Sequence, residues 1–318
     1  MDLECLQPQL FKDFNQILKS DRMNHAYLFS GDFASFDFAL YLAKSRFCEN
    51  LHDGRPCGKC RECQLIDDND FSDVKVVKPT GQIIKTETIR EMMRDFSRSG
   101  FEGKSQVFII QGCEKMHVNA ANSLLKFIEE PQSSSYMILL TSDESKMLPT
   151  IKSRTQVFRF PKNKKFLVEQ AEKAGILKTQ ADILAELAKT PAHLDELMAD
   201  KKILDLLQTI ERFISILFKD KAIAYLETGH LVQATLEKSE QELVFQLLPL
   251  FLAKQFNQKE SLTYLEKSYR AQQMWRSNVS FQKCARIYGD FMTEVLSVKY
   301  EETGKVVYVL PKPKLSSW

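Results

Sequence analysis

The residues with the clearest capacity for chemistry are four cysteines that fall close together in the first part of the chain. The stretch CENLHDGRPCGKCREC places Cys57, Cys60 and Cys63 at C-x2-C-x2-C spacing, and Cys48 lies upstream of them. Thiolates at this spacing can close a tetrahedral zinc site with bonds of about 2.3 Å, and the glycines and proline between them allow the tight turns that such a site needs. The sequence therefore predicts that these cysteines bind one metal ion.

The cysteine spacing identifies the ligands but does not by itself identify the metal. An iron–sulfur cluster is the alternative to zinc, because its cysteine spacings overlap with those of zinc sites. We favour zinc because Gly-Lys-Cys and Arg-Glu-Cys surround the sulfurs with charge, as on an exposed knuckle. Four thiolates leave no position open for water, so the zinc is expected to be structural. His52 is expected to be a solvated loop residue.

A second segment has the setting of a nucleotide-binding loop without its chemistry. In LFSGDFASFDFALYLAKSRFC a short apolar run leads into Gly31, and an amphipathic helix follows, which is the strand, loop and helix of a phosphate-binding P-loop. Counted from Gly31, that motif has Gly, Lys and Ser or Thr where this chain has Phe36, Asp37 and Phe38. Asp37 would put a negative charge beside the γ-phosphate, which costs about 1 kcal/mol at ~4 Å in water and about 4 at an effective dielectric constant of ~20.

The motif that should hold magnesium and water is altered as well. A strand ending in acidic residues is expected at VFIIQGCEKM, but Gln111 and Gly112 stand where Asp and Glu belong. Glu114 is expected to be a solvated loop carboxylate. Two motifs have lost their function independently, so we expect no ATP cofactor and no ATPase activity from the isolated chain.

Alternating strands and helices must position these segments. Helical spacing occurs at 87–98 and at 120–130, and the second helix is expected to have Asn119 as its N-cap and to end at Pro131. Near-continuous apolar strands between helices indicate a mostly parallel sheet covered on both faces, and residues 1–162 are therefore expected to form an α/β domain. The expected strands lie at 27–29, 74–79, 107–112, 136–142 and 156–160.

The rest of the chain is expected to be helical. A small helical unit is predicted over 163–202, broken at Thr190-Pro191, and a larger helical domain over 203–318, with a possible short strand at 305–310. A net charge of +2 means that any DNA contact must come from local patches. No apolar run approaches the roughly 20 residues that a membrane helix needs, and the first residues lack the order of a secretory signal, so we expect a cytoplasmic protein that does not bind membranes.

Several segments carry a family pattern in their sequence and order. They are HAYLFSG (25–31), the four-cysteine insert, VFII (107–110), NAANSLLKFIEEP (119–131) and LPTIKSR (148–154). Together they resemble the bacterial DNA polymerase III clamp-loader subunits, a branch of the AAA+ proteins, and within that family the delta-prime type of Gram-positive bacteria. The resemblance implies an AAA+ RecA-like domain with a zinc module at about 48–63, then a helical lid and a helical collar that serves oligomerisation.

The resemblance also implies a role. In this family the delta-prime type is a non-catalytic stator that docks on gamma/tau and delta subunits and so acts indirectly on the sliding clamp and primed DNA. It offers the arginine of a Ser-Arg-Cys motif to the ATP of a gamma/tau neighbour, and the motif reads Ser153-Arg154-Thr155 here. Arg154, with Ser153, is therefore the expected catalytic element, acting in trans. The family's second sensor arginine is replaced in TPAHLDEL, near His193.

Two other functions are compatible with the sequence. One is a weakly active clamp-loader ATPase of the gamma/tau type that tolerates the altered loop. The other is a zinc-containing DNA-binding protein, which the near-neutral net charge disfavours.

Overall fold

The chain forms two compact units in the computed structural model. The N-terminal unit comprises residues 1–167 and 189–191, and the C-terminal unit comprises residues 168–188 and 192–318. The division of the helical part into a lid (163–202) and a collar (203–318) stays a prediction. The structure describes residues 2–79, 81, 83–96, 105–130, 134–255 and 260–286, together with 299–300 and 306–307.

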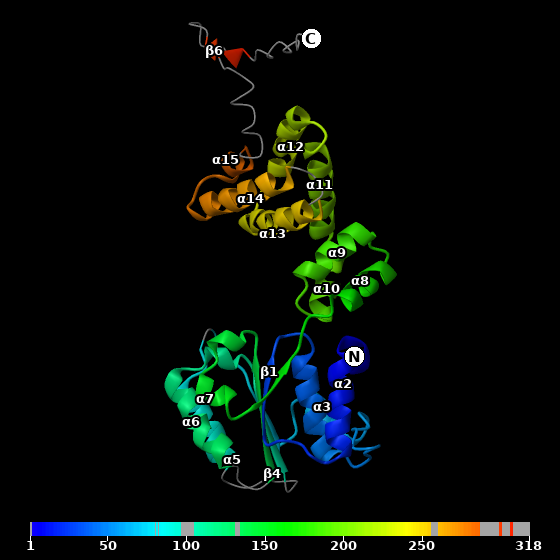
Figure 1. The fold of residues 1–318 in the computed structure, drawn as a ribbon, viewed down its shortest axis with the longest axis vertical. Coiled ribbons are helices and arrows are strands. Elements are labelled where there is room, and N and C mark those ends of the chain that lie inside the picture. The colour runs from blue at the N-terminus through cyan, green and yellow to red at the C-terminus, as the bar shows by residue number, and fades with distance from the viewer. Residues whose placement is uncertain are drawn as a thin grey trace, which may run out of the picture. The chain divides into compact units, whose positions relative to one another are not determined.

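A five-stranded parallel sheet forms the centre of the N-terminal unit (Figure 1), in the order β2-β3-β4-β1-β5. Each strand overlaps a predicted one, and the interior of β1 is fully buried, as expected of a sheet covered on both faces. The predicted α/β fold class, a parallel sheet with helices on both faces, is confirmed. The strands are β1 (Ala26–Ser30), β2 (Val74–Val77), β3 (Ser105–Ile110), β4 (Ser134–Thr141) and β5 (Gln156–Arg159).

Helices cover the two faces of this sheet with different kinds of core. The helices α2 (Pro8–Lys19) and α3 (Ser35–Phe47) lie on one face, where Phe14 packs against several aromatic rings of β1, α3 and β5. The helices α5 (Thr86–Phe96), α6 (Val118–Glu129) and α7 (Pro149–Lys152) cover the other face over a mainly aliphatic core. Short helices α1 (Leu3–Leu6) and α4 (Arg61–Asp67) complete the unit, with single turns η1 (Cys113–Lys115) and η2 (Glu144–Lys146).

The start of α6 differs from the prediction. Asn119 is not the N-cap: the helix begins at Val118, and Nδ1 of His117 accepts a hydrogen bond from the backbone N–H of Asn119 at 3.3 Å. The ring nitrogen of His117 thus does what the asparagine oxygen was expected to do. The expected end of the helix at Pro131 lies outside the described residues, and Glu130 is the C-cap.

The described residues from 164 to 286 form helices and their connections, and most of them belong to the C-terminal unit. The predicted break at Thr190-Pro191 is present, because Pro191 begins a new helix, a position that suits its fixed φ. Leu207, Ile210 and Ile214, which recur at helical spacing, are buried along α11. The helices are α8 (Lys164–Lys173), α9 (Lys178–Leu187), α10 (Pro191–Ala199), α11 (Lys201–Leu217), α12 (Lys221–Gln233), α13 (Lys238–Lys254), α14 (Ser261–Arg276) and α15 (Phe281–Arg286).

Beyond these helices, β6 (Lys299–Tyr300) pairs with β7 (Val306–Val307) in an antiparallel bridge, and β7 falls within the strand predicted at 305–310. Among the described residues, none of the helices combines the length and the apolar character that crossing a membrane would require.

Candidate functional site

Arg154 lies in the short connection between α7 and β5. Helix α7 begins with Pro149 at its first position and is anchored by Ile151, which is fully buried. The backbone N–H of Arg154 then bonds to the carbonyl of Ile151 at 3.0 Å. The backbone is therefore held by buried Ile151 before the arginine and by the pairing of β5 with β1 after it, while the arginine side chain itself is 39% exposed.

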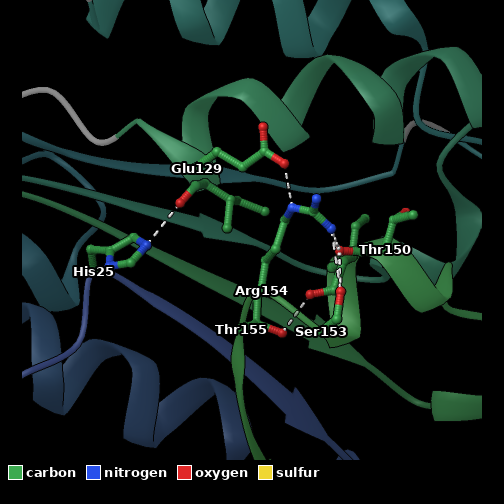
Figure 2. Close-up of polar contacts among 8 residues, drawn as sticks. His25, Glu129, Thr150, Ser153, Arg154 and Thr155 are labelled. Atoms are coloured by element: carbon green, nitrogen blue, oxygen red, sulfur yellow. Dashed lines mark hydrogen bonds and ion pairs between the residues drawn. The ribbon is translucent and has the colours of Figure 1, made fainter.

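The guanidinium group of Arg154 has three partners (Figure 2). Its Nε donates to the carboxylate of Glu129 at the end of α6, and its Nη1 donates to the carbonyl of Thr150 at 3.1 Å and to Oγ of Ser153 at 3.3 Å. Ser153 and Arg154, predicted to act together, are thus in contact. Thr155, which stands where the family pattern has cysteine, donates its hydroxyl to the carbonyl of Ile151 at 3.0 Å.

The vacated P-loop and Arg154 lie at opposite ends of the parallel strands. Gly31 follows the carboxyl end of β1, whereas Arg154 precedes the amino end of β5, and these neighbouring strands are parallel with Tyr27 opposite Gln156 and Ser30 opposite Arg159. The two pairs are three steps apart along the strands, a span of about 10 Å at ~3.3 Å per residue. Arg154 is therefore outside the reach of a nucleotide in its own chain's loop.

Packing accounts for the one P-loop residue that the chain retains. Gly31 has φ +108°, and a Cβ at this position would lie 2.3 Å from the carbonyl oxygen of Phe160. Its N–H bonds to the carbonyl of Thr141 at 2.8 Å. Glycine is required here by the close approach of the chain after β5, whether or not a phosphate binds.

The two phenylalanines at the replaced positions pack against other parts of the chain, and the aspartate between them carries a charge. The ring of Phe38 is fully buried, and Phe36 is half-buried with Nζ of Lys78 5.6 Å from its ring centroid. Asp37 lies in the first turn of α3, where its carboxylate occupies the favourable end of the helix dipole that a phosphate would use. Desolvation raises the pKa of Asp37 even though part of the side chain is exposed, and its own backbone N–H opposes the shift.

The loop after β3 carries the second altered motif. Gln111 and Gly112 follow directly on the last residue of β3, and Gly112 adopts φ +62°. The prediction that Glu114 is a solvated carboxylate is wrong: it is half-buried and accepts a hydrogen bond from Oγ of Ser142 at 2.9 Å. Desolvation, and next the charge of Glu114, raise the pKa of Asp32. Two carboxylates thus face the space where phosphates would carry negative charge.

Thr141, at the carboxyl end of β4, is 1% exposed and accepts a hydrogen bond from the backbone N–H of Asp143 at 3.1 Å. It is a turn residue, and its hydroxyl is already bonded within its own loop.

The four predicted cysteines converge. The sulfur atoms of Cys48, Cys57, Cys60 and Cys63 all lie within 4.8 Å of one another. The sulfurs of Cys48 and Cys60 are 3.8 Å apart, which is the separation of about 3.8 Å that tetrahedral coordination with ~2.3 Å bonds requires. These residues could hold a metal ion, and His52 is not part of the group.

Backbone amides prepare the sulfurs of this cluster for a metal. Cys57 Sγ accepts N–H bonds from Lys59 at 3.4 Å and Cys60 at 3.3 Å, and these two amides lower the pKa of Cys57 to about 6. Burial instead raises the pKa of Cys48 and of Cys63. Gly58 turns with φ +68° between the ligands, as the predicted tight turn requires.

Comparison with known proteins agrees with these features. The sequence profile of the family described as DNA polymerase III, delta subunit, matches residues 6–164. The chain is 32% identical to DNA polymerase III subunit delta' of Bacillus subtilis over 272 residues, which cover 83% of this chain and 82% of that one. The chain belongs to the DNA polymerase III delta-prime family. Subunit delta' of Pseudomonas aeruginosa is 33% identical over 134 residues, 41% of each chain.

The gamma/tau subunits resemble this delta-prime family member over a shorter stretch. DNA polymerase III subunit tau/gamma of Haemophilus influenzae is 32% identical over 143 residues, which cover 44% of this chain and 21% of that one. The stretch is about as long as the sheet domain.

Glu129 and His25 belong to the arginine's surroundings, and the sequence does not predict this. In the sequence Glu129 stands only in the family pattern at the end of a packed helix. The available signal was its position, because a carboxylate in the last turn of a helix opposes the helix dipole. No comparable sequence signal connects His25, whose Nε2 lies 2.8 Å from the carbonyl of Ile128, with that helix end.

Proposed function

We propose that this delta-prime family member is a clamp-loader subunit of the bacterial DNA polymerase III holoenzyme that binds no ATP itself. It serves as a stator, docks on gamma/tau and delta subunits, and supplies Arg154 to the ATP site of a gamma/tau neighbour. Through that assembly it helps to place the sliding clamp on primed DNA. The relatives named delta' and tau/gamma support the assembly, and the filled P-loop supports the absence of a nucleotide.

The placement of Arg154 is the observation that carries this proposal. The arginine is held by three hydrogen bonds and is 39% exposed, at the end of the strands opposite its own P-loop. An arginine in that position can reach a nucleotide only on another chain. Delivered in trans, a guanidinium stabilises the charge that develops on the transferring phosphoryl group, and Ser153 helps to orient it.

We also propose that the four cysteines hold a structural zinc ion. The thiolate donor set, the sulfur separation and the N–H bonds to sulfur all fit zinc. All four positions would be occupied by protein, so the ion would stabilise the loop that joins α3 to α4 and would not act on a substrate. Residues 163–202 and 203–318 would be lid and collar, and the protein would work in the cytoplasm.

Two measurements test the stator proposal. Isothermal titration of the isolated chain with magnesium and ATP should give no binding in the micromolar range. The chain should co-purify with a gamma/tau partner that has an intact P-loop. Micromolar ATP binding would favour the weakly active ATPase instead, and failure to assemble would refute the stator role.

A further inference from the structure

We propose that Glu129 is the positioning residue of Arg154, an inference that rests on the function proposed above. Glu129 is the last residue of α6, and its carboxylate accepts the Nε hydrogen bond of the arginine. Figure 2 shows that the carboxylate and the α7 turn hold the guanidinium group from two directions. Helix α6 thereby sets the direction in which the arginine points.

The bonding pattern leaves one end of the guanidinium group available. Glu129 uses Nε, while Thr150 and Ser153 use both donors of Nη1. Among the residues that the structure describes, Nη2 has no hydrogen-bond partner. With Nε and Nη1 bonded within the chain, Nη2 can donate to a phosphate oxygen. The side chain also loses less conformational entropy when it binds, because these hydrogen bonds already restrict it.

The carboxylate of Glu129 projects from a rigid support. Leu124 and Ile128 of α6 are buried in the aliphatic core at 0% and 2% exposure. His25, just before β1, places Nε2 2.8 Å from the carbonyl oxygen of Ile128, the residue next to Glu129. Because β1 pairs with β5, the same part of the sheet supports the helix end and the strand that follows Arg154.

The charge of Glu129 is unfavourable for the helix alone. Glu129 and Glu130 stand at the carboxyl end of α6, where negative charge opposes the helix dipole. The ion pair with Arg154 has side chains that are 46% and 39% exposed, and pairs this exposed contribute little to folding. A residue that stabilises neither its helix nor the fold appreciably is typical of a functional position. The function that we assign to Glu129 is to orient Arg154.

A mutant cycle in the reconstituted clamp loader tests this inference. The variants are Glu129→Ala, Glu129→Gln, Arg154→Ala and the double variant Glu129→Ala/Arg154→Ala. Glu130→Ala is the matched control, because Glu130 has the same charge at the same helix end and is not a hydrogen-bond partner of Arg154. The readouts are kcat and KM of the DNA-stimulated ATPase, the yield of assembled loader and the thermal stability of the chain.

Glu129→Ala should lower kcat by about three- to tenfold, the cost of ordering one long side chain anew in each catalytic event, with KM, assembly and thermal stability unchanged. Glu129→Gln should stay within about twofold of the parent, because its amide oxygen still accepts the Nε bond, and Glu130→Ala should have no effect. The double variant should be no slower than Arg154→Ala alone.

If Arg154→Ala is defective, three results would overturn the inference about Glu129. The first is an unchanged kcat for Glu129→Ala. The second is an increased kcat for that variant, which would mean that the carboxylate restrains the arginine, and the third is a double variant slower than Arg154→Ala. If Arg154→Ala itself has full activity, the proposed function fails, and the role of Glu129 fails with it.

Discussion

Restoring the P-loop residues at positions 36 to 38 should destabilise the chain and should not create an ATPase. The side chain of Phe38 is fully buried, with ring centroids 5.3 Å from Phe160 and 5.6 Å from Phe14. Removing a core phenylalanine costs about 3–5 kcal/mol, and a threonine there also buries a hydroxyl without a partner in the ring cluster. We therefore expect Phe38→Thr to lower the free energy of unfolding by about 4 kcal/mol, a large share of the ~5–15 kcal/mol of a typical domain.

Urea unfolding of the isolated chain measures this loss. The matched control is Phe36→Gly, which removes a half-buried ring from the same helix turn and should cost only about 1–2 kcal/mol. The triple variant Phe36→Gly/Asp37→Lys/Phe38→Thr should show no ATP hydrolysis above the parent chain in a phosphate-release assay, because Gln111 and Gly112 still supply no carboxylate to hold magnesium and the attacking water. A triple variant within about 1 kcal/mol of the parent in stability that also hydrolyses ATP would refute the reasoning.

Three further predictions follow from the same geometry. Gly31→Ala should destabilise the N-terminal unit by at least about 2 kcal/mol more than Gly81→Ala in urea unfolding. Both positions have positive φ, but of the two only an added Cβ at position 31 would clash with a carbonyl oxygen, at 2.3 Å. Equal losses of stability would contradict the packing account. Metal analysis should find about one zinc ion per chain, and chelation should lower the thermal midpoint; iron, or no metal, would reject zinc. The folded-state pKa of Asp37 is raised, so its ionised carboxylate opposes folding above that pKa. Asp37→Asn should therefore raise the free energy of unfolding at neutral pH, and this gain should vanish as the pH falls below the ordinary pKa of aspartate. A gain that persists in acid would exclude this cause.

The sequence predicts most of the sheet because the parallel strands are buried on both faces and read as short apolar runs between helices. The cysteine cluster was equally predictable, since ligand spacing in a short loop nearly determines proximity. The filled P-loop could be recognised from residue types alone. Two features could not be predicted from residue types: the place of Phe38 in an aromatic core and the close approach of Gly31 to the carbonyl of Phe160. Both depend on packing between distant parts of the chain.

The surroundings of Arg154 were the least predictable part of the site. The motif identified the arginine, but Glu129 is 25 residues away in sequence and meets it only after α6 and α7 pack on the same face of the sheet. The burial of Glu114 could not be predicted either, because its partner Ser142 lies in the loop after another strand. Contacts of this kind depend on the order of strands in the sheet, which local patterns do not specify.

The central claim is that Arg154 acts on ATP bound by a neighbouring subunit, and single-turnover hydrolysis by the assembled loader on primed DNA tests it most directly. The account predicts that Arg154→Ala assembles in full yield but slows hydrolysis at the adjacent ATP site by about a thousandfold or more, with Arg154→Lys recovering only part of the rate because lysine lacks the planar fork. An Arg154→Ala loader that assembles normally and hydrolyses ATP at the parent rate at every site would contradict it.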